Sequence, residues 1–278
     1  MPPLEADAVA ELRAIAAQVA GEAASLVREL RAGTVSAVAT KSSQTDVVTA
    51  ADTAAEELIR RRLAELRPGE PVLGEEGGGA ETTLPGRLGW VVDPIDGTVN
   101  YLYGYPWYAV SVAAVVDRRA VAGAVVEPSS GRVWSAAAGQ GASCDGRPLW
   151  ASATSRLDLA LVATGFSYTA ERRQRQAGLV ARLLPRVRDV RRAGSAALDL
   201  CAVAAGWVDG YVEHGLSWWD WAAGGLIAAE AGAVVRPPAL PGSVEPPDGL
   251  GRDAVFAAAP GVAAELAALC VELDAGEV

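Results

Sequence analysis

The residues with the clearest chemistry are Asp93 and Asp96, two carboxylates at the end of an apolar run. The run predicts a strand that Pro94 ends, and Asp96-Gly97-Thr98 predicts a turn that opens a helix. Carboxylates that converge at one strand end repel each other unless a cation separates them, and Mg²⁺ prefers carboxylate oxygens as ligands. The amides of Gly97 and Thr98, at a helix start, would face an anion such as phosphate. One short segment could therefore bind both metal and phosphate.

The same pattern also fits an ordinary turn, in which Asp93 caps the helix and Asp96 is solvated. Other polar clusters favour a site. Glu75 follows another short apolar run, and Asp220 opens a helix of small residues. A third cluster, ahead of the second predicted helix, contains Lys41, Asp46 and Asp52. No cysteine is followed six residues later by arginine, and no D-x-D occurs, so the sequence has neither of these patterns for a covalent phosphoenzyme.

Four ordered segments resemble the inositol monophosphatase family. DPIDGTVNY (93–101) resembles its first signature, and WWDWAAGGLIAAEAG (218–232) resembles its second. EPSSGRVWSAAAGQGASCDGRPL (127–149) and RRAGSAALDLCAVAAGWVDGYVE (191–213) are similar to the segments between them. The resemblance runs from about Leu4 to the last predicted helix.

The resemblance implies two or three Mg²⁺ ions in each active site. The first ion would be held by Glu75, Asp93 and the backbone carbonyl of Ile95. The second would be held by Asp93, Asp96 and Asp220. A weaker third ion would bind near Glu75, largely through water, with help from the region of Asp46 and Asp52. Lys41, Asp46 and Asp52 would be supporting residues.

The resemblance also implies how the reaction proceeds. Glu75 would orient a metal-bound water or take its proton, with Thr98 as a hydrogen-bonding partner. Asp93 would bridge the two ions. Phosphate would lie against Ile95, Asp96, Gly97 and Thr98. Lithium sensitivity is implied as well.

The substrate alcohol would bind in the second half of the chain. Gly194, Ser195, Ala196, Glu213 and Asp220 match positions that contact hydroxyls, and Arg191 matches a position beside the substrate. A carboxylate such as Glu213 accepts hydrogen bonds from neutral hydroxyls and repels an additional phosphate, which favours inositol-like monophosphates. The alternative for Glu213 is an exposed charge on an edge strand.

Two rival functions remain open at this stage. A sister phosphatase of the same fold could act on histidinol phosphate, fructose 1,6-bisphosphate or 3′-phosphoadenosine 5′-phosphate, because the metal motifs act on the shared phosphoryl group. A non-catalytic scaffold could keep the fold, but it would not need four mutually repelling carboxylates. His214, the only histidine, is a weak candidate for a base or a ligand because Mg²⁺ prefers oxygen.

The surrounding elements predict an α/β chain. Helices are expected at 4–30 and 51–66, with strands at 89–92, 109–116, 121–126 and 133–136. Beyond about residue 155, strands alternate with helices, and 236–252 is expected to be a loop. The resemblance implies a layered α+β sandwich of alternating helix and sheet layers, as in the inositol monophosphatase and fructose-1,6-bisphosphatase-like fold. We expect an N-terminal metal- and phosphate-binding half at 1–155 and a C-terminal substrate-binding half at 156–278, in one compact catalytic unit.

Composition narrows the classes of partner. A net charge of −10 over 278 residues argues against a nucleic-acid partner, because nucleic acid binds to basic surfaces. Residues 1–32 lack the pattern of a signal peptide, and no apolar stretch is long enough to span a membrane, so we expect a cytoplasmic protein that does not bind membranes. The tryptophans beside the motifs could serve core packing or a dimer contact, and we expect a homodimer. The expected partner is a small phosphate monoester.

Overall fold

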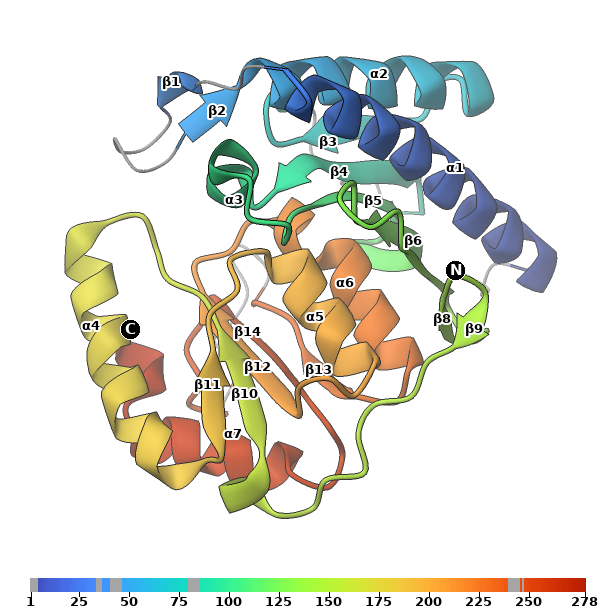
Figure 1. Cartoon of the computed structure of the whole chain (residues 1–278). Coiled ribbons are helices and arrows are strands. Elements are labelled where there is room, and N and C mark those ends of the chain that lie inside the picture. Colours follow the sequence, from blue (N-terminus) through green and yellow to red (C-terminus); the bar gives the residue numbers. More distant parts are fainter. Residues whose placement is uncertain (1–4, 34–36, 41–46, 80–85, 240–245, 247) are drawn as a thin grey trace.

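The computed structural model describes residues 5–33, 37–40, 47–79, 86–239, 246 and 248–278. Helix and sheet layers alternate through these parts of the chain (Figure 1), which confirms the predicted layered sandwich. The helices are α1 (Ala6–Arg31), α2 (Ala50–Leu66), α3 (Thr98–Tyr103), α4 (Ala170–Leu183), α5 (Ala196–Ala204), α6 (Trp218–Glu230) and α7 (Ala263–Glu272). Short 3₁₀ turns lie at Leu157–Leu159, Leu184–Arg186 and Ala275–Glu277.

The first layer pair is formed by α1 and α2 against one face of a seven-stranded sheet. In spatial order the strands are β3 (Val72–Gly74), β4 (Leu88–Asp96), β5 (Ala109–Val116), β6 (Arg119–Val126), β7 (Val133–Ala137), β8 (Ala142–Cys144) and β9 (Arg147–Pro148). β3 and β4 are parallel, and the other neighbours are antiparallel. β4 and β5 are almost wholly buried because helices cover both faces of the sheet, which explains their nearly continuous apolar sequences.

The second sheet has five strands in the order β11 (Asp189–Arg191), β10 (Leu161–Thr164), β12 (Gly210–His214), β14 (Ala254–Ala258) and β13 (Val234–Arg236). α5 and α6 lie between the two sheets, and α4 and α7 cover the outer face (Figure 1). The tryptophans beside the motifs are half-buried and pack against the clusters between the sheets. Their place in these clusters favours core packing.

Polar caps set where three of the helices begin. The carboxylate of Asp52 accepts the Thr49 N–H at 2.8 Å, so α2 starts with a capping box. The Ser195 hydroxyl accepts the Leu198 N–H at 3.3 Å at the start of α5. The Asp220 carboxylate accepts the Ser217 N–H at 2.7 Å at the start of α6. Three of the predicted site residues are therefore helix-capping residues.

One prediction about β4 is wrong. Pro94 does not end this strand, which continues to Asp96 and pairs with β5 on both sides of the proline. The register shifts between Asp93 and Asp96, because Asp93 pairs with Ser111 and Asp96 with Ala109. Three positions along β4 therefore lie opposite two positions along β5. Such a bulge accommodates proline without a ladder hydrogen bond and redirects the side chains beside it. Both aspartates therefore emerge from one irregular strand end.

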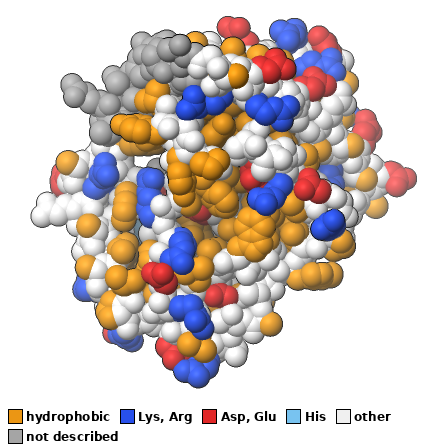
Figure 2. Space-filling view, in the orientation of Figure 1, with side chains coloured by type: hydrophobic (Ala, Val, Ile, Leu, Met, Phe, Trp, Pro, Cys, Tyr) orange, Lys and Arg blue, Asp and Glu red, His pale blue; other side chains and the backbone are white. Residues whose placement is uncertain are grey.

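A short hairpin of β1 (Ala37–Thr40) and β2 (Val47–Thr49) precedes α2. The predicted loop after β13 lies partly outside the described residues. On the face in Figure 2, hydrophobic side chains gather across the middle with basic side chains around them. All three cysteines are free thiols, and Cys201 and Cys270 are buried. Among the described residues, no helix is both long and apolar enough to cross a membrane.

Candidate active site

A cavity of about 380 Å³ lies where the irregular end of β4 meets the second sheet. It is lined by residues from both halves of the chain, which include Glu75, Asp93, Ile95, Asp96, Gly97, Thr98, Gly194, Ala196, Glu213 and Asp220. These ten residues were all predicted site residues. The structure thus brings together side chains that are up to 145 positions apart in the sequence, from Glu75 to Asp220.

The floor of the cavity carries the carboxylate cluster. Oxygens of Asp93, Asp96 and Asp220 lie within 4.8 Å of one another. Burial raises the pKa of Asp93 well above its usual range, and repulsion by Glu75, Asp96 and Asp220 adds to the effect. Burial also raises the pKa of Asp96 from 3.8 to about 6 and that of Asp220 well above its usual value. Ionisation of all three carboxyl groups is therefore unfavourable unless a positive charge lies beside them.

Each carboxylate of the cluster is oriented by its local structure. One oxygen of Asp96 accepts hydrogen bonds from the Ser195 hydroxyl at 2.6 Å and the Ala197 N–H at 2.7 Å. Asp93 accepts the Ile95 N–H at 3.0 Å across the bulge. These contacts use one oxygen of each group, so the other oxygens can face the cavity. Ser195 itself is buried behind Asp96 rather than lining the cavity.

Thr98 has a partner that the sequence did not indicate. Its hydroxyl lies 3.0 Å from Oδ1 of Asp52 and 3.0 Å from the Ile95 carbonyl oxygen. Asp52 is fully buried, and its other oxygen accepts the Thr49 N–H and hydroxyl. The sequence had placed Asp52 in the cluster with Lys41 and Asp46, near the third ion that the resemblance implies. Lys41 and Asp46 lie outside the described residues. Asp52 therefore links the start of α2 to the corner between β4 and α3.

Gly97 makes the close approach between the two halves possible. It adopts a left-handed backbone with φ of 94°, which favours glycine. A β-carbon here would lie 3.0 Å from the Gly194 carbonyl oxygen and 3.1 Å from that of Trp107. The Asn100 side chain spans the same junction, donating to the Trp107 and Ala193 carbonyls at 2.7 and 2.9 Å. The predicted phosphate-binding corner is thus fixed against the second half of the chain.

The second half forms the opposite wall. Glu213 accepts a hydrogen bond from the Tyr211 hydroxyl at 2.6 Å, and burial raises the pKa of its carboxyl group. Gly165 lies directly against this carboxylate, since a β-carbon there would lie 1.9 Å from a Glu213 oxygen. Glu213 is thus half-buried in the wall of the cavity rather than a solvated edge charge.

The arginine beside the cavity is not the one that the resemblance indicated. Arg191 is exposed and pairs with Asp189 at 2.6 Å, whereas Arg192 lines the cavity. The Arg192 guanidinium also lies over the Phe166 ring at 5.9 Å. Phe166 and Tyr168 extend the wall into a shallower apolar groove beside the cavity. Neither aromatic residue was predicted from the sequence, because isolated aromatic residues in a loop carry no chemical pattern.

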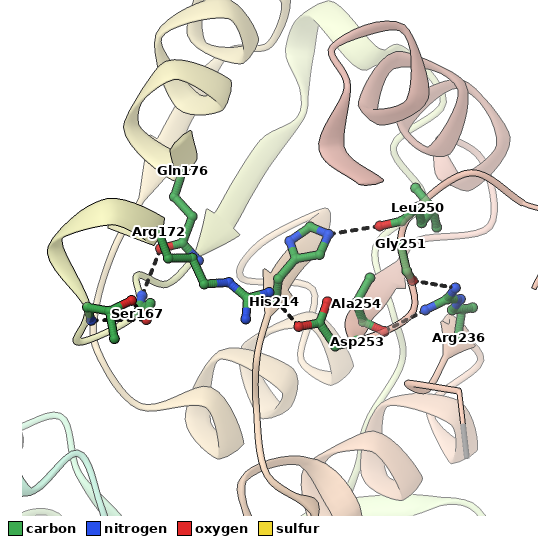
Figure 3. A network of polar contacts seen from close by, with 10 residues as sticks. Ser167, Arg172, Gln176, His214, Arg236, Leu250, Gly251, Asp253 and Ala254 are labelled. Carbon is green, nitrogen blue, oxygen red and sulfur yellow. Dashed lines mark hydrogen bonds and ion pairs between the residues drawn. The ribbon is translucent and has the colours of Figure 1, made fainter. Parts of the chain in front are cut away.

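A polar network supports this wall from behind (Figure 3). Arg172 from α4 pairs with Asp253, and the Nε2 atom of His214 lies 2.8 Å from the Leu250 carbonyl oxygen. The Ser167 N–H donates to the Gln176 side chain at 2.7 Å. Burial lowers the pKa of His214, so a neutral ring that donates to Leu250 fits this site. These contacts give His214 a structural role at the edge of the cavity.

The donor set of the cluster fits Mg²⁺. All of its side chains offer carboxylate oxygens, and the Ile95 carbonyl lies at the same strand end. Burial, and after it repulsion between the carboxylates, raises the pKa values of Asp93 and Asp220, and a hard cation with oxygen ligands would offset both effects. The absence of histidine and cysteine from the cluster argues against metals that prefer nitrogen or sulfur.

Comparison with known proteins agrees with this geometry. Residues 8–274 match the model of the inositol monophosphatase family. The Inositol-1-monophosphatase of Mycobacterium leprae (strain TN) is 53% identical over 276 residues, with 93% of each chain covered. The Nus factor SuhB of Escherichia coli (strain K12) is 37% identical over 222 residues, covering 80% of this chain and 83% of that protein. The structure of Mycobacterium tuberculosis SuhB superposes with a TM-score of 0.81 at 47% identity, covering 96% of this chain and 98% of that one.

Proposed function

The chain belongs to the inositol monophosphatase family, and from this membership we propose a Mg²⁺-dependent phosphomonoesterase that hydrolyses myo-inositol monophosphate or a similar polyol or sugar phosphate. The products would be the alcohol and inorganic phosphate. The observation that carries the proposal is the cluster of Asp93, Asp96 and Asp220 on the floor of a polar cavity. We propose that the two halves, 1–155 and 156–278, act as one catalytic unit, since both line this cavity.

We propose two Mg²⁺ positions, as the family resemblance implies. Glu75, Asp93 and the Ile95 carbonyl would hold one ion, and Asp93, Asp96 and Asp220 would hold the other. A third position near Glu75 would draw on the region of Asp52. When bound, the ions lower the pKa of a coordinated water and offset charge on the phosphoryl oxygens.

The chain's own residues position and deprotonate the attacking water. Glu75 lies at the cavity and accepts a proton from the water. The Thr98 hydroxyl, held between Asp52 and the Ile95 carbonyl, fixes the side of the site from which the water attacks. The amides of Gly97 and Thr98 donate to the phosphoryl oxygens, with Ile95 and Asp96 bounding the same subsite. This arrangement needs no covalent intermediate.

The alcohol would bind against the second half. Glu213 accepts hydrogen bonds from ring hydroxyls, and Asp220, Gly194 and Ala196 shape the subsite. Ser195 acts indirectly by holding Asp96. For the arginine beside the substrate we propose Arg192 in place of Arg191, because Arg192 lines the cavity.

A phosphate-release assay tests the proposal. The panel contains myo-inositol 1-phosphate, histidinol phosphate, fructose 1,6-bisphosphate, 3′-phosphoadenosine 5′-phosphate and a simple alkyl phosphate, each with Mg²⁺ and with chelator. We expect Mg²⁺-dependent release with the highest kcat/KM for inositol phosphate. Preference for another panel member would identify a sister phosphatase. If no phosphate is released from any of them, a non-catalytic role is favoured. The name of the E. coli relative, Nus factor SuhB, is the observation that motivates this alternative.

Two further properties belong to the same proposal. Lithium should inhibit uncompetitively by occupying the second cation position after turnover, and Asp220→Asn should weaken this inhibition. A homodimer fits the exposed aromatic side chains of Tyr103, Trp150 and Trp207, which are 82%, 75% and 47% exposed. Light scattering coupled to size-exclusion chromatography measures the oligomeric state. Because the net charge is −10, we do not expect nucleic acid to be a partner.

A further inference from the structure

Glu56 is a buried carboxylate that holds the loop on which Glu75 lies. Only 2% of Glu56 is exposed, on the face of α2 that packs against the seven-stranded sheet. Its two oxygens accept the N–H groups of the two residues that follow Glu75, namely Glu76 at 2.7 Å and Gly77 at 2.8 Å. A carboxylate that bonds consecutive amides fixes both the position and the direction of the chain there.

Arg60, one helical turn after Glu56, also bonds to this loop. Its Nε donates to Glu56 Oε1 at 2.8 Å, which compensates the buried charge. The same guanidinium donates to the carbonyl oxygens of Val72, in β3, at 3.1 Å and of Gly78. Glu56 and Arg60 together therefore contact the chain on both sides of Glu75.

The fit between this pair and the loop is close. A β-carbon at Gly74 would lie 2.4 Å from Glu56 Oε1, and one at Gly77 would lie 2.7 Å from it. The Gly74 N–H also donates to the Gly78 carbonyl at 3.0 Å, which closes the loop on itself. Glycine on either side of the Glu75–Glu76 pair thus lets the loop approach the carboxylate of Glu56.

Asp52 and Glu56 are four residues apart, so they share one face of α2. Asp52 contacts Thr98 at the corner after β4, and Glu56 contacts the loop after β3. Two buried carboxylates of one helix therefore hold two different segments of the cavity wall. Because α2 is a single rigid element, it fixes the distance between these segments.

We propose that Glu56, supported by Arg60, is a positioning residue that places Glu75 for cation binding. This inference rests on the proposed function, since Glu75 is a cation ligand only in that context. Glu56 itself does not line the cavity, and its charge is compensated by Arg60. Its effect is therefore exerted through the backbone at Glu76 and Gly77.

The test is Glu56→Gln, which keeps the size of the side chain but leaves one oxygen to accept two amides. Outer partners of metal ligands contribute roughly 10–100-fold to metal affinity. We expect calorimetric titration with Mg²⁺ alone to show affinity weakened by about 10-fold or more. The Mg²⁺ concentration for half-maximal activity should rise in parallel, and excess Mg²⁺ should recover most of kcat. Glu75→Gln, by contrast, should not be recovered by excess Mg²⁺.

Glu57→Gln is the matched control, because Glu57 is exposed on the same helix and should leave Mg²⁺ affinity unchanged. If Glu56→Gln fails to fold, Arg60→Lys is the second variant. It keeps the positive charge beside Glu56 but loses the forked contacts to Val72 and Gly78. We expect it to weaken Mg²⁺ binding to a smaller extent. A folded Glu56→Gln protein with wild-type Mg²⁺ affinity would overturn the proposal. A wild-type protein that binds Mg²⁺ but hydrolyses no phosphomonoester would instead refute the proposed function, and the calorimetric comparison would still decide the role of Glu56.

Discussion

The two walls of the cavity are built in different ways. On the wall formed by β4, α3 and α6, which we call the cation wall, Asp93, Asp96 and Thr98 are buried and each bonds to backbone or to a buried partner. On the wall formed by residues 165–169, 192–196 and 213–217, which we call the alcohol wall, several side chains project into solvent. Tyr168 is 39% exposed, and Arg192 is exposed as well. The cation wall is thus fixed more firmly than the alcohol wall.

This difference follows from what each wall would contact. The cation wall gathers like charges, and such groups need many fixed hydrogen bonds to stay close together. The start of α2, α5 and α6 supplies these bonds, through Asp52, Ser195 and the Ser217 N–H. In the proposed function the alcohol wall would meet neutral hydroxyls, for which one well-placed acceptor such as Glu213 is sufficient. We therefore expect changes in the cation wall to affect every substrate, and changes in the alcohol wall to affect selectivity.

The largest expected effect comes from Asp93→Asn. Asp93 is the carboxylate proposed to bridge both cations, and asparagine keeps the shape but removes the charge. Cation stabilisation of the transition state amounts to several kcal/mol, so kcat/KM should fall by roughly 10³-fold or more. Steady-state assays across the substrate panel measure the loss, which should be the same for each substrate. A loss confined to inositol phosphate would contradict the division between the walls.

A smaller loss is expected for Glu75→Gln. This variant keeps one oxygen but removes the charge and the capacity to accept a proton, so kcat should fall by at least ~10²-fold, as for loss of a general base. Thermal unfolding should change little, because Glu75 is only half-buried at the cavity. Glu57→Gln serves as the control for a neutralised glutamate in the first half. Unchanged kcat in Glu75→Gln would exclude Glu75 as the base.

The cation wall was also the part that could be predicted from sequence. The segment from Asp93 to Thr98 carries its chemistry in consecutive residues, and its position after an apolar run indicates a strand end. Most of the elements given bounds from sequence were likewise predicted within a few residues, and β5 matches its predicted bounds. The exception was Pro94, where pairing with β5 on both sides outweighs the tendency of proline to end a strand.

Contacts between distant segments could not be predicted in this way. Asp52 was recognised as polar, but its bond to Thr98 spans 46 positions and depends on how α2 packs on the sheet. Glu56 and Arg60 have the spacing of any exposed helical ion pair. Between Arg191 and Arg192, the choice depends on which side of the β11 edge faces the cavity. Each of these features is set by packing rather than by local pattern.

Stability against pH should report the cost of ionising the buried Asp96, whose pKa is raised mainly by burial and further by Glu213. The pKa of Asp96 is raised from 3.8 to about 6, so the folded protein without cations binds a proton more tightly than the unfolded chain. Stability is therefore highest below the unfolded pKa and is lost as pH rises through about 6, by up to roughly 3 kcal/mol. Denaturant unfolding in chelator at about pH 4.5 and about pH 7 measures roughly 2 kcal/mol of this loss, because the unfolded carboxyl is already largely ionised at the lower pH.

Asp96→Asn is the comparison for that measurement. Asparagine can still accept the bonds from Ser195 and Ala197 but cannot ionise, so the variant should lose less stability between the two pH values. Excess Mg²⁺ at the higher pH should stabilise the wild type more than the variant. Parallel pH profiles for the two proteins would show that ionisation of the buried Asp96 does not set the pH dependence.

The smallest effect, and the most selective one, is expected for Glu213→Gln on the alcohol wall. Glutamine can still accept the Tyr211 hydroxyl bond, and it fits against Gly165 because its shape is that of glutamate. It loses the charge that strengthens hydrogen bonds from ring hydroxyls, which is about 1–2 kcal/mol for a charged partner, so kcat/KM for inositol phosphate should fall by roughly 10-fold. A simple alkyl phosphate has no hydroxyls to lose and should be hydrolysed at nearly the wild-type rate. The ratio of the two kcat/KM values therefore reports on Glu213 alone, because any disturbance of the cation wall cancels in it. An equal loss on both substrates would place Glu213 with the cation wall and remove the main physical support for an inositol-like substrate.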